Sequence, residues 1–418
     1  MTSFWRIFWL EFTGFVRSKA LALLVAASVL WMLVLPSVMK GDGTADGARE
    51  LYVHYSLGGV FALLVVALLA SATGSLARER EAKRLQLTLV RPVRYMLVVL
   101  GKILAHAAAG AMVLALACGV LAFGTDLGRP CNHVLSPILP TPREEARQAY
   151  EAYVKDPATP EQFRRTKKAI VLRLLESRAM DRYDSIRTNA TATWKFAAPG
   201  AAGGLAVRMR FTNQYEMRQD VKGTFRIDGC EGVVSNVTQA VLTVPLTARA
   251  SDGRRETGEL AFENQGTSAL MLRPRKDINL LVPADAFWRN LLRAYVVLVA
   301  ILTFVVTLGT FLSAGLGRPV ALFVAFVTLI VSEMSPSVVQ QYPDELETNL
   351  ADRIGLHITR FATEVTRPVS AASPLEALSK DECVEPGVVL RMAAANLLAA
   401  PLVLSLLAAL LLPRKQDY

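Results

Sequence analysis

Long stretches without Lys, Arg, Asp or Glu recur along the chain, separated by polar segments. A helix needs about 20 apolar residues to cross a hydrocarbon core, and one central Lys or Arg would cost it about 2.5–3.5 kcal/mol. The pattern therefore predicts an α-helical membrane protein with six transmembrane helices. They are Ala20–Met39, Leu51–Ala77, Ile103–Thr125, Ala294–Gly317, Pro319 to about Val339, and Met392–Pro413.

The fifth of these spans contains a charged residue. Only Pro319–Ser332 is free of charge, so Glu333 must lie near an interface, pair inside the helix bundle or face a water-filled cavity. A polar intramembrane site at Glu333 and a simple interfacial position both stay open.

Residues 126–288 follow a different pattern. A charged, helix-rich section comes first, from about Arg143 to Tyr183. In 205–212 and 223–228 the apolar residues then alternate with polar ones, which predicts half-buried strands. Further strand-like runs are Val233–Pro245, Thr257–Asn264, Ala269–Arg273 and Ile278–Val282. We expect an inserted α+β domain with an antiparallel β-sandwich, between membrane domains at residues 1–125 and 289–418.

The first residues form an aromatic face ahead of the first span. Trp5, Phe8, Trp9, Phe12 and Phe15 recur at helical spacing. This predicts an amphipathic helix in the inner headgroup layer, where aromatic rings are favoured. The alternative is that the segment simply extends the first span.

Composition agrees with a membrane protein, since 52% of the 418 residues are hydrophobic and only 20% are charged. The net charge of +10 would suggest nucleic-acid binding in a soluble protein. No basic and aromatic repeat or zinc-ligand spacing supports that class, so we expect no nucleic-acid partner. The first apolar run is too long for a signal peptide and lacks a small-residue cleavage site.

The distribution of Lys and Arg predicts the orientation. With the N-terminus inside, the inner segments hold 13 Lys and Arg, whereas the short outer loops, which are longer in total, hold six. Both termini are therefore expected in the cytoplasm, and the inserted domain and the loop 340–387 outside it. The Ala- and Arg-rich composition suggests a bacterial cytoplasmic membrane.

Three of the four cysteines lie in predicted outer segments, where disulfides can form. Cys118 is within the third span, and Cys131, Cys230 and Cys383 are outside it. We consider a Cys131–Cys230 disulfide, with thiols at both positions as the alternative.

The connection between spans two and three, residues 78–102, combines charge with leucines. Arg78-Glu79-Arg80-Glu81 begins it, Leu85, Leu87 and Leu89 follow, Arg91-Pro92 ends the helix and Gly101-Lys102 leads into the next span. A loop obeying the positive-inside rule explains its Lys and Arg but not this order of Leu, Pro and Gly-Lys. We expect the segment to lie along the cytoplasmic surface and to present charge to a soluble partner.

These motifs, with the six spans and inner termini, resemble the type-2 permease family of ATP-binding-cassette (ABC) transporters. The resemblance implies a coupling helix within residues 78–102 that docks on a separate ATPase subunit. It also implies an interfacial N-terminal helix and short re-entrant outer helices in the loop 340–387. The implied ATPase-coupling residues are Arg78, Glu79, Arg80, Glu81, Arg84, Arg91, Pro92 and Lys102.

No motif in the chain indicates catalysis. Gly101-Lys102 lacks the leading glycine of a P-loop, and the four histidines show no metal-ligand spacing. We therefore expect no enzyme activity, cofactor or metal in this chain, and ATP hydrolysis by a partner subunit.

The favoured function is the permease subunit of an ABC transporter, for export or mechanical coupling. Its expected partners are a P-loop ATPase subunit, a second permease subunit, the lipid bilayer and an extracytoplasmic accessory protein. The alternative is a membrane anchor that transports nothing and presents the inserted domain as a binding or scaffold module. A membrane enzyme ranks third, because no catalytic constellation is visible within the spans.

Overall fold

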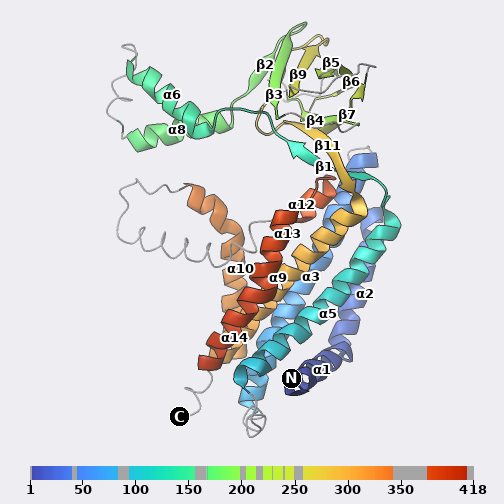
Figure 1. Cartoon of the computed structure of the whole chain (residues 1–418), viewed down its shortest axis with the longest axis vertical. Coiled ribbons are helices and arrows are strands. Elements are labelled where there is room, and N and C mark those ends of the chain that lie inside the picture. Colours follow the sequence, from blue (N-terminus) through green and yellow to red (C-terminus); the bar gives the residue numbers. More distant parts are fainter. Residues whose placement is uncertain are drawn as a thin grey trace. The chain divides into compact units, whose positions relative to one another are not determined.

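The computed structural model describes residues 2–39, 45–82, 94–155, 166, 168–197, 204–212, 220–227, 229–238, 241–248, 258–341 and 374–411. The chain folds as two compact units, drawn in Figure 1. We call residues 1–129 and 286–418 the helical unit, and residues 130–285 the β unit.

The helical unit is a bundle of apolar helices. It contains α1 (Thr2–Val16), α2 (Lys19–Val38), α3 (Ala45–Glu81), α5 (Tyr95–Gly124), α9 (Phe287–Gly315), α10 (Arg318–Gln341), α12 (Pro374–Ser379), α13 (Pro386–Ala393), the π-helical segment η1 (Ala394–Ala399) and α14 (Ala400–Leu411).

Five stretches of helix within the described residues are long and apolar enough to cross a membrane. They are Lys19–Val38, Gly47–Glu79, Tyr95–Gly124, Phe287–Gly315 and Pro386–Leu410. Helices of the required length and apolar composition therefore occupy predicted spans one to four and six. The predicted fifth span falls on α10, whose apolar part, Arg318–Val331, is shorter. The sixth membrane crossing stays a prediction.

The helix α9 occupies the centre of the bundle. Of its apolar window 78% is buried inside the protein, against 22% for the window in α2, so α2 is peripheral. A helix that is apolar on every side can pack against other helices all round, as α9 does. Its hydroxyl groups bond within the helix, as Thr307 does by donating to the Thr303 carbonyl oxygen at 2.6 Å. These bonds leave the outside of α9 free for close packing against α3 and α5.

The N-terminal helix is separate from the first span. The helix α1 ends at Val16, and Ser18 caps α2 by accepting a hydrogen bond from the Leu21 backbone N–H at 3.2 Å. Exposed Trp5 and Trp9 stack with Phe8 and Phe12 along one side of α1. The alternative in which α1 continues α2 therefore does not fit, and its position in the headgroup layer stays a prediction.

The β unit contains a helical hairpin and two main sheets. Its elements are β1 (Pro130–Leu135), α6 (Pro142–Lys155), α8 (Lys168–Met180), β2 (Asp184–Ile186), β3 (Thr191–Phe196), β4 (Ala206–Arg210), β5 (Asp220–Ile227), β6 (Cys230–Val237), β7 (Val241–Pro245), β8 (Thr247–Ala248), β9 (Gly258–Asn264), β10 (Leu270–Leu272) and β11 (Ile278–Ala286).

Antiparallel pairing organises the strands. One sheet has the order β1-β11-β4-β7, another β3-β9-β5-β6-β8, and β10 pairs with β2. Val207 of β4 lies opposite Val244 of β7, and Phe225 of β5 lies opposite Phe262 of β9. The inward residues of both main sheets share one hydrophobic core. The prediction of a β-rich region with antiparallel sheets is confirmed.

Two predictions for the β unit are wrong in detail. The run Val233–Pro245 is divided between β6 and β7, which belong to different sheets. The Cys131–Cys230 disulfide is also wrong, because Cys230 is a thiol. Cys230 is buried in the shared core, where a thiol packs as a small apolar group.

The hairpin of α6 and α8 begins with reciprocal caps. The Thr141 backbone N–H donates to Glu144 Oε2 at 2.8 Å, and the Glu144 N–H donates to Thr141 Oγ1 at 3.3 Å. The backbone hydrogen bond from Thr141 is the main cause that lowers the pKa of Glu144. Val171 and Leu175 of α8 then pack against Ala146 of α6.

Gly223 offers a test of the β unit. An added Cβ would lie 2.4 Å from the Phe262 ring and 2.6 Å from the Glu263 backbone oxygen, so Gly223→Ala is expected to overpack the sheet. We expect its free energy of unfolding to fall by about 1–3 kcal/mol. Thermal labelling of the buried Cys230 thiol with a maleimide, read by mass spectrometry, should begin at a lower temperature.

The exposed Thr193 of β3 provides the control, and Thr193→Ala should label at the temperature of the unaltered protein. Equal labelling temperatures for Gly223→Ala and the unaltered protein would contradict the register described for β5 and β9.

Candidate functional site

The predicted coupling residues that the structure describes lie at one end of the bundle. Arg78, Glu79, Arg80 and Glu81 form the end of α3, and Lys102 lies near the beginning of α5. The helix α1 and the end of α14 lie at this same end (Figure 1). Arg84, Arg91 and Pro92 lie outside the described residues, as does the Arg80 side chain.

Lys102 joins three helices through its ammonium group. Its side chain is only 2% exposed, and Nζ donates to Oε1 of Glu79 on α3 at 2.8 Å. Nζ also donates to Oε1 of Glu11 on α1. A buried ammonium group needs such partners, since desolvation of an unpaired charge costs several kcal/mol. The three charged groups therefore hold the ends of α1, α3 and α5 together, and we call them the Lys102 junction.

The neighbouring glycine explains how α1 comes so close. A Cβ added to Gly101 would lie 3.1 Å from Ile7 Cγ2 and 3.6 Å from the Phe8 backbone nitrogen. A larger side chain would push α1 away and separate Glu11 from Lys102. The Gly101-Lys102 pair thus has a structural role in which Gly101 lets α1 approach and Lys102 binds it.

His106 adds a neutral link one turn further along α5. Its Nδ1 lies 2.9 Å from the Lys102 carbonyl oxygen, and its Nε2 lies 3.0 Å from the hydroxyl oxygen of Ser71 on α3. The carbonyl oxygen can only accept, so Nδ1 carries the proton and, in the neutral ring, Nε2 accepts from Ser71. The Phe15 ring of α1 packs against this imidazole with ring centroids 5.3 Å apart.

Two arginines gather beside the junction. Arg78 Nε donates to the Gly74 carbonyl oxygen at 2.9 Å. A Cβ on Gly74 would lie 3.1 Å from Arg78 Nη2 and 3.2 Å from Nε of Arg318, the first residue of α10. Both side chains are exposed, so this end of the bundle presents cationic groups around the buried Lys102.

Sequence reasoning missed Glu11 as a partner of Lys102. The available signal was that Lys102 stands at the start of a long uncharged run and that Glu11 is the only acidic residue before Asp42. A cation at the edge of a span requires a counter-charge. The missing information was the fold of α1 back onto α5.

The arrangement of charges at this site suits the transmission of force between helices. Among the described residues, no three His, Cys, Asp or Glu side chains come together as a metal site. The described groups at the Lys102 junction pair with one another, which suits a rigid connection between helices. Glu333 lies on α10, and its side chain is outside the described residues.

Comparison with known families supports a transport role for this part of the chain. Residues 5–139 match the family model described as ABC-2 family transporter protein. The match confirms the predicted resemblance to the type-2 permease family and supports a membrane transporter component. No curated protein and no solved structure matched the chain. Together with the five apolar helices, the match makes the chain a multi-pass membrane protein.

The contact between α1 and α5 predicts an engineered crosslink. The Ile7 Cβ lies 3.6 Å from the position of a Cβ on Gly101, within the range of disulfides. Ile7→Cys combined with Gly101→Cys should therefore form a disulfide under mild oxidation, detected by mass spectrometry of the joined peptides. Ile7→Cys with Met112→Cys should not, because Met112 lies about 16 Å further along α5. Equal yields for the two pairs would contradict the placement of α1.

Removal of the ammonium group should loosen α1. Lys102→Met leaves the Glu11 and Glu79 carboxylates facing each other, and their side chains are 20% and 32% exposed. Solvent screening reduces the cost below that of a fully buried pair, to about 1–3 kcal/mol. In the variant that also carries Ile7→Cys and Gly101→Cys, the engineered disulfide should then form more slowly in detergent. An unchanged rate would show that the Lys102 junction does not hold α1.

Proposed function

Starting from the ABC-2 family match of residues 5–139, we propose that the chain is the permease subunit of an ATP-driven transporter. ATP is bound and hydrolysed by a separate P-loop ATPase subunit, and a second permease subunit, identical or related, completes the translocation path. Export or mechanical coupling across the cytoplasmic membrane fits this family better than uptake does. The assignment of direction rests on the family resemblance.

The observation that carries the proposal is the Lys102 junction at the base of the charged connection. Glu79 lies two residues before the end of α3 at Glu81, and it binds Lys102 directly. A force applied to the connection therefore reaches α5 through Lys102 and α1 through Glu11. Simple obedience to the positive-inside rule would not require a buried ion pair between these helices.

The mechanism that follows is a rigid-body shift. When the ATPase dimer closes on ATP, it displaces the connection 83–93 and the end of α3. The ion pairs to Lys102 make α1 and α5 follow α3. Repacking then occurs around α9, the helix on which both α3 and α5 lie. A small displacement can move the bundle from one conformation to another, because packed helix interfaces switch between distinct arrangements rather than deform continuously.

The orientation is part of the proposal. Arg78 and Arg318 lie at the end of the bundle that holds the Lys102 junction, as the positive-inside rule expects for a cytoplasmic end. Both termini are then cytoplasmic and the β unit is extracytoplasmic, where it receives cargo or an accessory protein. A membrane anchor that only presents the β unit would use the Lys102 junction for helix packing alone and would leave the charged connection without a partner.

Co-purification tests the ATPase partner. The tagged chain, extracted in mild detergent, should retain a P-loop ATPase with ATP hydrolysis activity. Changing Arg80 and Glu81 to Ala is expected to reduce the retained ATPase at least about tenfold, since hydrogen bonds to charged groups contribute about 1.5–3 kcal/mol each. The retained chains are identified and quantified by mass spectrometry.

Arg143 and Glu144 of α6 provide a matched control, because they form the same Arg-Glu pair on the surface of the β unit. Their replacement by Ala should leave ATPase retention unchanged. Recovery of extracytoplasmic proteins without any ATPase, in several detergents, would favour the anchor and end the coupling assignment.

A further inference from the structure

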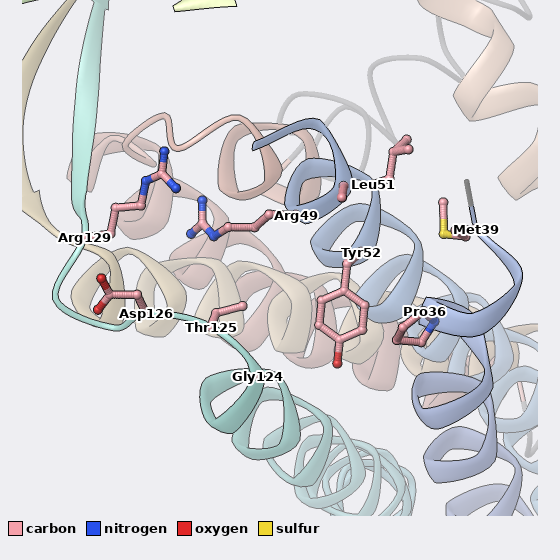
Figure 2. Close-up of a pocket in the computed structure, with 10 residues that line it drawn as sticks. Pro36, Met39, Arg49, Leu51, Tyr52, Gly124, Thr125, Asp126 and Arg129 are labelled. Carbon is pink, nitrogen blue, oxygen red and sulfur yellow. The ribbon is translucent and has the colours of Figure 1, made fainter. Parts of the chain in front are cut away.

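A pocket of about 360 Å³ lies at the other end of the bundle from the Lys102 junction. It is formed where the end of α2, the beginning of α3 and the end of α5 meet (Figure 2). Gly124 in its wall lies roughly 33 Å along α5 from Lys102. The mechanism above does not use this pocket.

Arg49 on α3 is a largely buried charged group of the pocket wall. Its side chain is 15% exposed, and Nη1 donates to both carboxylate oxygens of Asp381 at 2.6 Å. The guanidinium carbon lies 4.9 Å from the ring centroid of Phe287. In contrast, Arg49 Nε and Nη2 are buried without a hydrogen-bond partner among the residues that the structure describes. Buried N–H groups of a cation normally have acceptors.

The Nε–Nη2 edge is the side of a guanidinium that binds an oxyanion with two parallel hydrogen bonds. The β unit shows this use directly. Arg273 Nε and Nη2 donate to the two carboxylate oxygens of Asp277 at 2.9 and 3.0 Å. Arg49 presents the same edge, but Asp381 occupies only Nη1. The edge of Arg49 therefore has the hydrogen-bonding capacity for one more oxyanion, and because both atoms are buried an oxyanion must displace the groups that cover them.

Asp381 is itself held in place, so Arg49 is oriented before any ligand arrives. Asp381 has a positive φ of 56° at the end of α12, where the Glu382 N–H donates to the Ala377 carbonyl oxygen at 2.7 Å. Asn290 of α9 then donates to the Glu382 carbonyl oxygen at 2.7 Å. These bonds connect the Asp381 turn to the central helix.

The remaining charges of the pocket set its selectivity. Arg129 Nε lies 3.3 Å from Asp381 Oδ2, so one carboxylate serves two arginines. Asp126, an exposed residue of the wall, accepts a hydrogen bond from the Gly128 N–H at 3.0 Å. The two arginines and two carboxylates balance, which disfavours a highly charged anion and suits a single phosphate or an amine-bearing phosphate.

We propose that this pocket binds the phosphate group of a phosphate ester, held by the Nε–Nη2 edge of Arg49. Pro36, Met39 and Tyr52 supply an apolar wall beside the cation. The peripheral α2, with Leu30, Leu33 and Val34 exposed, gives the surface next to that wall an apolar character. A phospholipid headgroup and a small soluble phosphate ester share the chemistry, and binding measurements separate them.

Three probes define the ligand. The full chain is purified in a detergent without phosphate and titrated with dioctanoyl phosphatidic acid, dioctanoylglycerol and glycerol 3-phosphate, with binding followed by native mass spectrometry. Phosphatidic acid should bind at least tenfold more tightly than dioctanoylglycerol, which has the same chains without the phosphate. Glycerol 3-phosphate binding as tightly as phosphatidic acid identifies a soluble ester as the source. Much weaker binding identifies a lipid headgroup.

Two substitutions test the role of Arg49. Arg49→Lys keeps the charge opposite Asp381 but removes the two-donor edge, and should weaken phosphatidic acid binding about tenfold. Asp126→Asn removes a negative charge from the wall and should strengthen it about threefold. Arg226→Lys on the exposed face of the β unit is the control and should leave binding unchanged.

Equal binding of phosphatidic acid and dioctanoylglycerol would overturn the proposal, because only the acyl chains would then be recognised. Equal binding by the unaltered chain and folded Arg49→Lys would overturn it too. If Arg49→Lys does not fold, unchanged binding by Asp126→Asn would count against the pocket instead. None of these measurements involves ATP or an ATPase, so they are independent of the proposed function.

Discussion

The buried ammonium group of Lys102 imposes the main constraint on the helical unit. A cation that is 2% exposed cannot remain charged at the start of an apolar helix unless anions reach it. Glu79 reaches it from the end of α3, and Glu11 reaches it from α1, which must therefore fold back onto α5. The glycine that precedes Lys102 provides the space. One charge thus determines how an N-terminal helix, a span and the end of a long helix are joined.

The rest of the chain is organised around two separate cores. In the helical unit α9 is buried on nearly all sides, and its hydroxyls bond to its own carbonyl oxygens, so it provides an apolar surface for α3 and α5. The β unit has its own core between the two main sheets. Because each core is complete in itself, the long insertion between α5 and α9 does not need to contribute to the packing of the bundle.

The sequence was informative where one local property decides the structure. Charge-free runs of about 20 residues predicted six spans, and five of them are helices long and apolar enough to cross a membrane. The runs are informative because a single buried charge would outweigh several apolar residues. Alternation predicted β4 and β5, whose inward side chains are buried in the core of the β unit. The motif at Arg80-Glu81 and Gly101-Lys102 predicted the family that residues 5–139 match.

Predictions failed or were missing where the structure depends on contacts between residues far apart in the chain. The run Val233–Pro245 is rich in Val and Thr at both ends, and only the sheet order shows that it changes sheets. Cys230 lies in an outer segment like Cys131, but its side chain is needed in the core. The partnership of Glu11 with Lys102 and that of Arg49 with Asp381 join residues far apart in the chain, and no periodicity reports such pairs.

The long helix α3 connects the two charged sites of the helical unit. Arg49 lies near its beginning and Glu79 near its end, separated by about 45 Å of helix without a proline. Suppose that a ligand binds Arg49 more tightly in one arrangement of the bundle. Its binding then shifts the whole bundle, including the Glu79 end, toward that arrangement by the difference in binding free energy. The reverse also holds, since displacement of the Glu79 end changes the affinity at Arg49. Each site therefore only has to make different contacts with α3 in the two arrangements of the bundle. A pathway of coupled side chains between the sites is not required.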